Sequence, residues 1–176
     1  MTYQNLPVDV KADVTYNLFD LASAAHALAF RNGFWTEPTN EDHQHCQIVA
    51  KIALIHTEVN EALLADEDDI AAELADIILR TLDLLWMLGQ TNYEFEPLTV
   101  GSIDEAEMER NLNSMHYKLS QATQEYRRSG NAVRWLRDVV ETTLGLGLDF
   151  DPDFLKIVQA KHEFNLTRPP KHGRLI

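Results

Sequence analysis

Two pairs of acidic residues have the spacing needed to hold a metal ion. Glu58 and Glu61 are three residues apart, and so are Glu73 and Asp76. Residues at this spacing project from the same side of a helix. Carboxylates crowded beside apolar neighbours are unfavourable unless they are protonated or bind cations. Because every donor is an oxygen atom, the expected cation is Mg²⁺, with Mn²⁺ as the other candidate.

A short acidic segment, DEDD at residues 66–69, separates the two pairs and is predicted to be the turn of a helical hairpin. Acidic residues also suit the N-terminus of the helix that follows. The turn places Glu61 opposite Glu73 and Glu58 opposite Asp76, so the four carboxylates meet if both faces point inward. The alternative is a solvated acidic face, which is where charged residues usually lie.

Arg80 follows Asp76 at a helical spacing of four residues. At this distance along a helix, opposite charges form ion pairs. We expect Arg80 either to orient the Asp76 carboxylate in this way or to form an ordinary exposed pair with it.

Helical periodicity runs through almost the whole chain. Apolar residues recur at intervals of three and four, and glycine and proline fall between the periodic segments. We expect helices over about residues 14–31, 40–64, 69–88, 103–128, 131–146 and 152–165. No segment alternates as a strand would. The sequence therefore predicts an all-α fold, a helical bundle in a single domain over residues 1–176. Its core has four helices if the second hairpin described below is a copy of the first.

The composition of the chain limits the kinds of partner and the cellular location that we expect. A chain of 176 residues with 45% hydrophobic content can bury a sizeable core in one domain. The net charge of −13 disfavours binding to nucleic acid or a membrane surface, although a phosphorylated small molecule can still be bound through metal ions. Cys46 is the only cysteine, which suits a reducing compartment. With neither a signal-peptide pattern nor a run of 18 apolar residues, a cytoplasmic location is expected.

The acidic pairs resemble the motif of the MazG-like all-α nucleoside triphosphate pyrophosphohydrolases. That family pattern has two acids three apart, a gap, and then Glu-x-x-Asp, and all of these positions are filled here. The C-terminal run KHEFNLTRPPKHGRLI is similar to a C-terminal element of MazG-like members, and GFW at residues 33–35 fits the loop before the metal-binding helices. The resemblance covers residues 33–90 and 161–174.

The resemblance implies Mg²⁺-dependent hydrolysis of a nucleoside triphosphate to a monophosphate and pyrophosphate. A deoxynucleotide is the expected substrate, although the sequence does not choose the base or the sugar. The metal ligands would be Glu58, Glu61, Glu73 and Asp76, and Glu58 or Glu61 would also be the general base. A homo-oligomer, either a dimer or a tetramer, is expected from the family. The absence of a Walker-type glycine loop from the sequence disfavours a P-loop NTPase.

Basic residues gather in the C-terminal part of the chain. From Lys161 onward, four lysines and arginines oppose one glutamate, which gives a local net charge of +3. We expect Lys161, Asn165 and Arg168 to bind phosphate oxygens, with Lys171 and His172 as helpers. The alternative is a solvated basic tail.

Trp35 lies in the loop before the first acidic pair. An aromatic side chain at this place can stack on the base of a nucleotide. It can equally pack as a core or interface residue.

A second region of the chain resembles the region of the acidic pairs in sequence. The segment that begins at Leu112 is similar to the one that begins at Ile52, and His116 matches His56 at an offset of 60. The counterparts of the four acids are, in order, Lys118, Gln121, Trp135 and Asp138. We hypothesise a degenerate copy of the hairpin over residues 103–148 that packs on the first and lacks most metal ligands. The alternative is two unrelated amphipathic hairpins of similar rhythm.

Two other functions are compatible with these residues. One is a non-catalytic helical module that binds a nucleotide or a protein partner and keeps the same fold. The other is a phosphohydrolase acting on another phosphorylated substrate, such as a diphosphate-linked metabolite.

Overall fold

The described structure is built almost entirely from helices, as the periodicity predicts. A computed structural model describes residues 15–98 and 104–169. Among these residues the helices are α1 (Phe19–Arg31), α2 (Glu41–Leu64), α3 (Ile70–Met87), α4 (Glu105–Ser129), α5 (Val133–Phe150) and α6 (Phe154–Thr167). The all-α prediction is confirmed, and none of the described helices has the length and apolar character needed to cross a bilayer.

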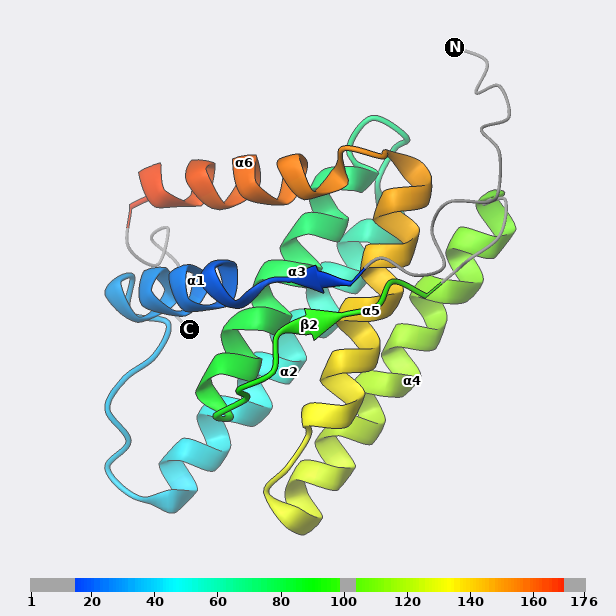
Figure 1. Ribbon diagram of the computed structural model, residues 1–176. Helices are drawn as coiled ribbons and strands as arrows, with labels where there is room; N and C mark the ends of the chain where they lie inside the picture. Colours follow the sequence, from blue (N-terminus) through cyan, green and yellow to red (C-terminus); the bar gives the residue numbers. More distant parts are fainter. Residues whose placement is uncertain (1–14, 99–103, 170–176) are drawn as a thin grey trace.

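Four of the helices form a bundle of two hairpins. The α2–α3 hairpin lies beside the α4–α5 hairpin, with α2 packed on α4 and α3 packed on α5 (Figure 1). The DEDD segment is the exposed turn between α2 and α3, as expected. Helices α1 and α6 run across the bundle, and both pack against α3.

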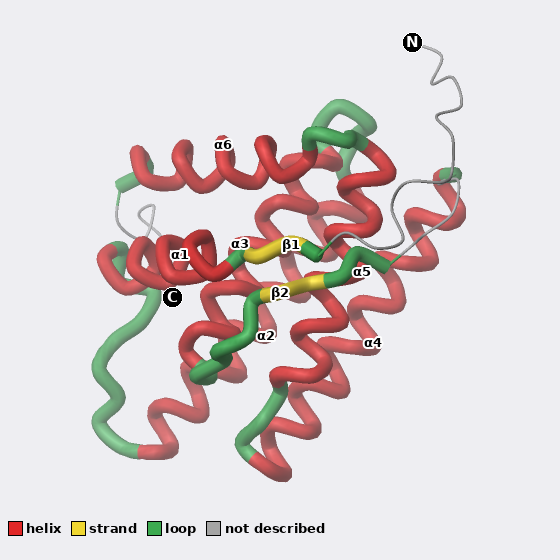
Figure 2. The backbone as a smooth tube through the Cα atoms, in the orientation of Figure 1, coloured by secondary structure: helices red, strands yellow, loops and turns green. Residues whose placement is uncertain are grey.

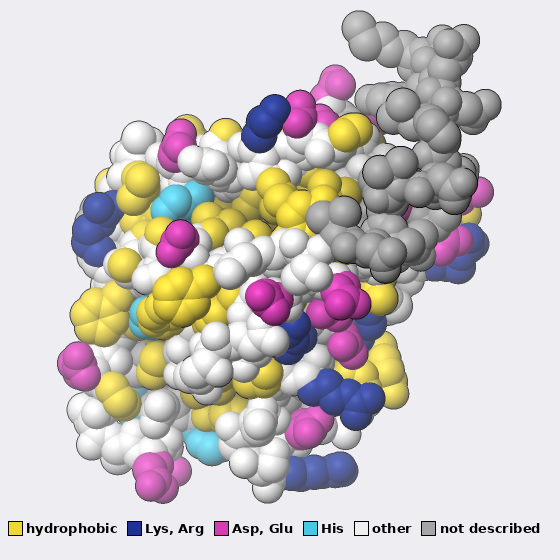
Figure 3. Space-filling model, in the orientation of Figure 1, with side chains coloured by type: hydrophobic (Ala, Val, Ile, Leu, Met, Phe, Trp, Pro, Cys, Tyr) yellow, Lys and Arg dark blue, Asp and Glu magenta, His cyan; other side chains and the backbone are white. Residues whose placement is uncertain are grey.

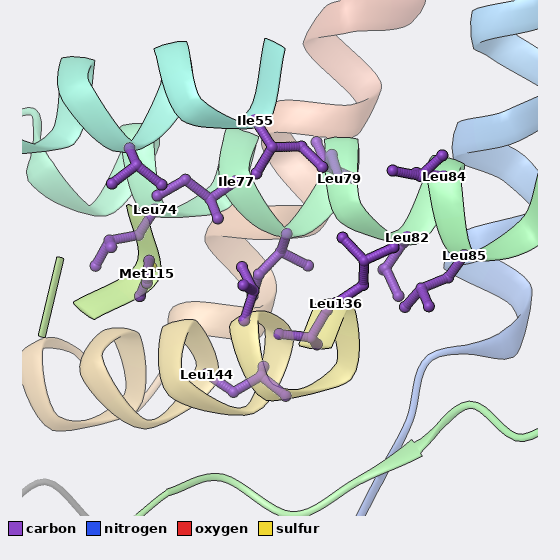
Figure 4. Close-up of a cluster of buried hydrophobic side chains, with 14 of the residues drawn as sticks. Ile55, Leu74, Ile77, Leu79, Leu82, Leu84, Leu85, Met115, Leu136 and Leu144 are labelled. Carbon is purple, nitrogen blue, oxygen red and sulfur yellow. The ribbon is translucent and has the colours of Figure 1, made fainter. Parts of the chain in front are cut away.

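Helix α3 is the centre of the molecule. It contacts α1, α2, α5 and α6, and its buried residues lie on nearly every side of the helix. A helix that is apolar all round is stable only when other elements cover it. Figure 4 shows the result, with Leu74, Ile77 and Leu82 of α3 facing Ile55 of α2 and Leu136 of α5. On the face in Figure 3, acidic and basic side chains are interspersed among hydrophobic ones, as on ordinary folded surfaces.

A pair of two-residue strands, β1 (Tyr16–Asn17) and β2 (Glu94–Phe95), was not predicted. The strands pair antiparallel, with Tyr16 opposite Phe95 (Figure 2). Arg137 of α5 donates hydrogen bonds to the carbonyl groups of Asn92 and Glu94 and so fixes the second strand against the bundle. Strands this short have no detectable alternation in the sequence.

The two hairpins meet in the manner expected of an internal repeat. His56 of α2 and His116 of α4 stack on each other, with their Nδ1 atoms 2.7 Å apart and an angle of 8° between the rings. Two residues at matching positions in two copies touch each other when an approximate twofold axis passes between them. The contact is compatible with α4–α5 being a degenerate copy of α2–α3 and also with two unrelated hairpins, so the repeat stays a hypothesis.

The backbone that follows β2 packs directly on α5. The Leu98 amide donates to the Glu141 carbonyl at 3.1 Å. A Cβ atom added at Gly145 would lie 2.0 Å from the Leu98 carbonyl oxygen, far inside van der Waals contact. Gly145 is therefore required by the close approach of a second backbone.

We expect Gly145→Ala to destabilise the protein by about 1–3 kcal/mol, because the clash outweighs the helix propensity gained from alanine. Chemical denaturation monitored by circular dichroism measures the change. Asn113→Ala, at an exposed position in α4, is the control and should change stability little. Equal stability of the Gly145 variant and the parent would contradict the close packing of this connection on α5.

Candidate metal centre

Three of the four predicted acidic ligands come together between α2 and α3. Glu58, Glu73 and Asp76 each offer a carboxylate oxygen, and these atoms all lie within 4.8 Å of one another. Glu58 is only 8% exposed, whereas Glu73 and Asp76 are partly exposed. The short turn between the helices brings Glu58 level with the pair on α3, as the sequence indicates.

Glu61 does not belong to this group and is exposed. The buried face of α2 is centred on Ile55, Val59 and Ala62. At about 100° per residue, Glu61 is rotated about 60° further from this face than Glu58 is. Its charge still reaches the cluster, because it contributes to raising the pKa of both Glu58 and Glu73. The prediction that all four carboxylates meet is therefore met by three, with Glu61 at the edge.

Two basic side chains balance the cluster. The Arg80 Nε donates to Glu58 Oε1 at 3.0 Å, and Lys161 Nζ lies 2.9 Å from Asp76 Oδ2. The sequence predicted that Arg80 would pair with Asp76 on its own helix, and this was wrong. Arg80 reaches across to α2 instead, while Asp76 is paired with a lysine from α6.

Burial raises the pKa of two of the three carboxylates, Glu58 and Glu73. Loss of solvent raises the pKa of Glu58 to about 7, and the neighbouring charge of Arg80 only partly opposes this. Burial likewise raises the pKa of Glu73, against the opposing effect of Lys161. Carboxylates whose charge is this costly gain most from a bound cation.

The donor set fits a hard divalent cation. It consists of carboxylate oxygens alone, and they project from two rigid helices. Mg²⁺ and Mn²⁺ prefer such oxygen ligands, whereas Zn²⁺ is bound mainly by histidine and cysteine. Within the described residues, the histidine pair of His56 and His116 is not part of the three-carboxylate group.

A pocket opens beside the cluster between α1, α3 and α6. Asp76 and Arg80 form part of its wall, together with Asn165 and Arg168 from the end of α6. The helix continues to Thr167, two residues beyond the predicted end, and Arg168 is its C-cap residue. Three predicted phosphate-binding residues, Lys161, Asn165 and Arg168, thus lie at the cluster or its pocket, while Lys171 and His172 fall outside the described residues.

Trp35 lies in the core rather than in the pocket. It is 3% exposed, and its indole Nε1 donates to Asp83 Oδ1 at 2.7 Å. The ammonium group of Lys51 sits 4.5 Å from the centre of its ring. A base cannot reach the ring in this arrangement, so the base-stacking interpretation of Trp35 is wrong and the core interpretation holds.

A buried polar network surrounds Asp83 and was not predicted from the sequence. Asp83 Oδ1 accepts hydrogen bonds from both Trp35 and His26 Nδ1, the latter at 2.8 Å, and Lys51 Nζ lies 3.6 Å from Oδ2. Asp83 and Lys51 are 2% and 5% exposed. The available signal was one acid and one lysine at positions that otherwise hold apolar residues on α3 and α2. The network ties α1, α2 and α3 together beneath the pocket.

We expect Asp83→Asn to destabilise the protein by about 3 kcal/mol, because it leaves the Lys51 ammonium buried without a counter-charge. Urea denaturation of the variant checks this. The double variant Asp83→Asn with Lys51→Met should recover part of the loss, since no unpaired charge remains. A double variant whose loss is the sum of the two single losses would show that the two groups are not coupled.

Stability should depend on pH through Glu58. Its pKa is raised in the folded protein to about 7, so the folded state holds a proton that the unfolded state releases from near its ordinary value of 4.5. Raising the pH across this window therefore destabilises the parent relative to Glu58→Gln, by up to about 3 kcal/mol.

The measurement is chemical denaturation of Glu58→Gln and the parent between about pH 4.5 and 7, without added divalent metal, over the window in which the two states bind different numbers of protons. Glu125→Gln, an exposed position on α4, serves as the control. A stability difference between Glu58→Gln and the parent that stays constant with pH would contradict a raised pKa at Glu58.

Comparison with known proteins gives no relative for this chain. No protein-family model, no curated protein and no solved structure matches the chain. Its function is therefore inferred from the residues of the site.

Proposed function

We propose that this protein hydrolyses a nucleoside triphosphate to the monophosphate and pyrophosphate in a Mg²⁺-dependent reaction, as the MazG-like enzymes that its motif resembles do. The observation that carries the proposal is the meeting of Glu58, Glu73 and Asp76, whose oxygens lie within 4.8 Å of one another beside a pocket lined by Asn165 and Arg168. A deoxynucleotide substrate, a cytoplasmic location and a homo-oligomeric state belong to the same proposal.

The metal ligands in this proposal are Glu58, Glu73 and Asp76. When bound, Mg²⁺ or Mn²⁺ neutralises charge on phosphate oxygens and lowers the pKa of a coordinated water. Arg80 keeps Glu58 oriented toward α3 through its hydrogen bond. Such support from a neighbouring group is what holds a ligand carboxylate in place.

We assign Glu61 the role of general base. Glu58 is buried and hydrogen-bonded to Arg80, whereas Glu61 is exposed at the edge of the cluster and free of those restraints. Glu61 would accept a proton as water attacks the α-phosphorus, and the bond from that phosphorus to the bridging oxygen would break. The products are then the monophosphate and pyrophosphate.

Helix α6 supplies the groups for phosphate binding. Lys161 is at Asp76, and the neighbouring pocket is lined by Asn165, one turn later, and by Arg168 at the end of the helix. Cationic and amide side chains bind phosphate oxygens through charge-assisted hydrogen bonds. Phosphoryl chemistry depends mainly on such positioning and charge stabilisation, so this set of residues suits the reaction.

Incubation with a panel of ribo- and deoxynucleoside triphosphates, with and without Mg²⁺, tests the proposal. We expect at least one nucleotide to give monophosphate and pyrophosphate, and only with metal. Asp76→Asn should lower kcat/KM by about 100-fold or more through loss of a metal ligand. Asp138→Asn, the matching change in the second hairpin, is the control and should leave both turnover and metal affinity near those of the parent.

Two results would contradict the proposal. One is the absence of monophosphate and pyrophosphate from every nucleotide, and the other is equal effects of Asp76→Asn and Asp138→Asn. Tight nucleotide binding by calorimetry without turnover would favour the non-catalytic binding module instead.

A further inference from the structure

The ion pair between Lys161 and Asp76 joins α6 to the candidate metal centre. Lys161 Nζ lies 2.9 Å from Asp76 Oδ2, and the two side chains are 20% and 18% exposed. Figure 1 shows α6 crossing the bundle, so the lysine reaches the cluster from outside the hairpin that carries the acids. Its charge also acts on Glu73, whose pKa it lowers against the effect of burial.

An ammonium group at this position competes with a metal ion. Asp76 is one of the three carboxylates that would hold the cation, and its Oδ2 is already engaged by Lys161. A divalent cation needs the same oxygen atoms and is repelled by a positive charge close to them. The two cations therefore cannot both contact Asp76 at full strength.

Of the two basic residues that contact the cluster within the described part of the chain, Lys161 is the one that can leave. Arg80 is held on α3 beside the acids, and its planar guanidinium hydrogen-bonds Glu58 from there. A lysine is a single charge on a flexible four-carbon stem, which can swing to another anion without movement of its helix. The neighbouring pocket, lined by Asn165 and Arg168, has a cavity volume of about 50 Å³, so in this proposal it takes a single phosphate group of the substrate.

We propose that Lys161 is a displaceable internal counter-ion: a divalent cation competes with it for Asp76 and, on binding, releases its ammonium group for the phosphate oxygens of the substrate. The inference rests on the metal-dependent function proposed above and adds an order of events. Metal binding comes with the loss of one contact between α6 and α3. Because coupling is reciprocal, a substrate that binds Lys161 strengthens metal binding.

The test measures metal affinity alone, with no nucleotide present. Isothermal titration with Mn²⁺ should show about two- to fivefold tighter binding to Lys161→Met than to the parent, the range expected from removing a partly exposed ion pair. Lys161→Arg keeps the charge and should bind Mn²⁺ nearly as the parent does. Lys156→Met is the matched control, because Lys156 lies on the same helix and pairs with the exposed side chain of Asp153 at 2.8 Å.

For the nucleotide, the same variant should bind more weakly, which is the opposite of its expected effect on Mn²⁺. If Lys161 moves to the phosphates, Lys161→Met should raise KM for the best substrate of the panel by about tenfold, the loss expected for a hydrogen bond to a charged group. A residue with only a structural role would weaken metal and substrate binding together. Far-UV circular dichroism establishes that each variant is folded, and Lys161→Gln replaces Lys161→Met if the latter is not.

The result that overturns the inference is a folded Lys161→Met, or Lys161→Gln, whose Mn²⁺ affinity is equal to or weaker than that of the parent. No measurable Mn²⁺ binding by any variant also overturns it. Tighter Mn²⁺ binding by Lys161→Met with no turnover of any nucleotide supports the competition and rejects the proposed hydrolysis. The two ideas therefore fail separately.

Discussion

Crowding of like charge against an apolar core is the constraint on which the rest of this structure depends. Glu58, Glu73 and Asp76 lie together at the seam between α2 and α3, and Glu58 is nearly out of contact with water. Carboxylates so placed repel one another, and each loses hydration. Two basic side chains partly neutralise this negative charge. Arg80 of α3 pairs with Glu58, and Lys161 of α6 pairs with Asp76. The position of α6 over the bundle is thus linked to the electrostatics of the hairpin beneath it.

The second hairpin has a basic residue at the position where the first hairpin has a buried acid. Lys118 stands where the first hairpin has Glu58, and it donates a hydrogen bond to Thr142, whose place in the first hairpin is taken by Arg80. The cross-helix contact is therefore preserved while its charges are changed. Of the acids only Asp138 remains, and Lys118 also donates to its backbone carbonyl. Among the described residues, the second hairpin therefore has an ammonium group at the position where the first hairpin contributes Glu58 to its carboxylate group.

The fold could be read from the sequence because it depends on local rules. Apolar spacing located all six of the described helices, and the DEDD segment located the turn between α2 and α3. The rotation that separates Glu61 from Glu58 depends on which residues centre the buried face of α2, and that is decided by packing against α4 as well as α3.

The partners of charged residues could not be predicted in the same way. Arg80 had two acids within reach, one on its own helix and one across the seam, and the choice depends on Lys161, which arrives from a helix some eighty residues later in the chain. The network of Asp83, Lys51 and Trp35 likewise joins three helices. Spacing along one helix carries no information about contacts of this kind.

The small strand pair has a consequence for how the protein comes apart. Pairing of β1 with β2 fixes the start of α1, through the bond from the Leu18 amide to the Tyr93 carbonyl, to a segment that is itself bonded to α5 by Arg137. The first helix is thereby fastened to the second hairpin although it packs on the first. Separating the two halves of the bundle must break this link as well as the shared core, so we expect the halves to unfold together rather than as independent units.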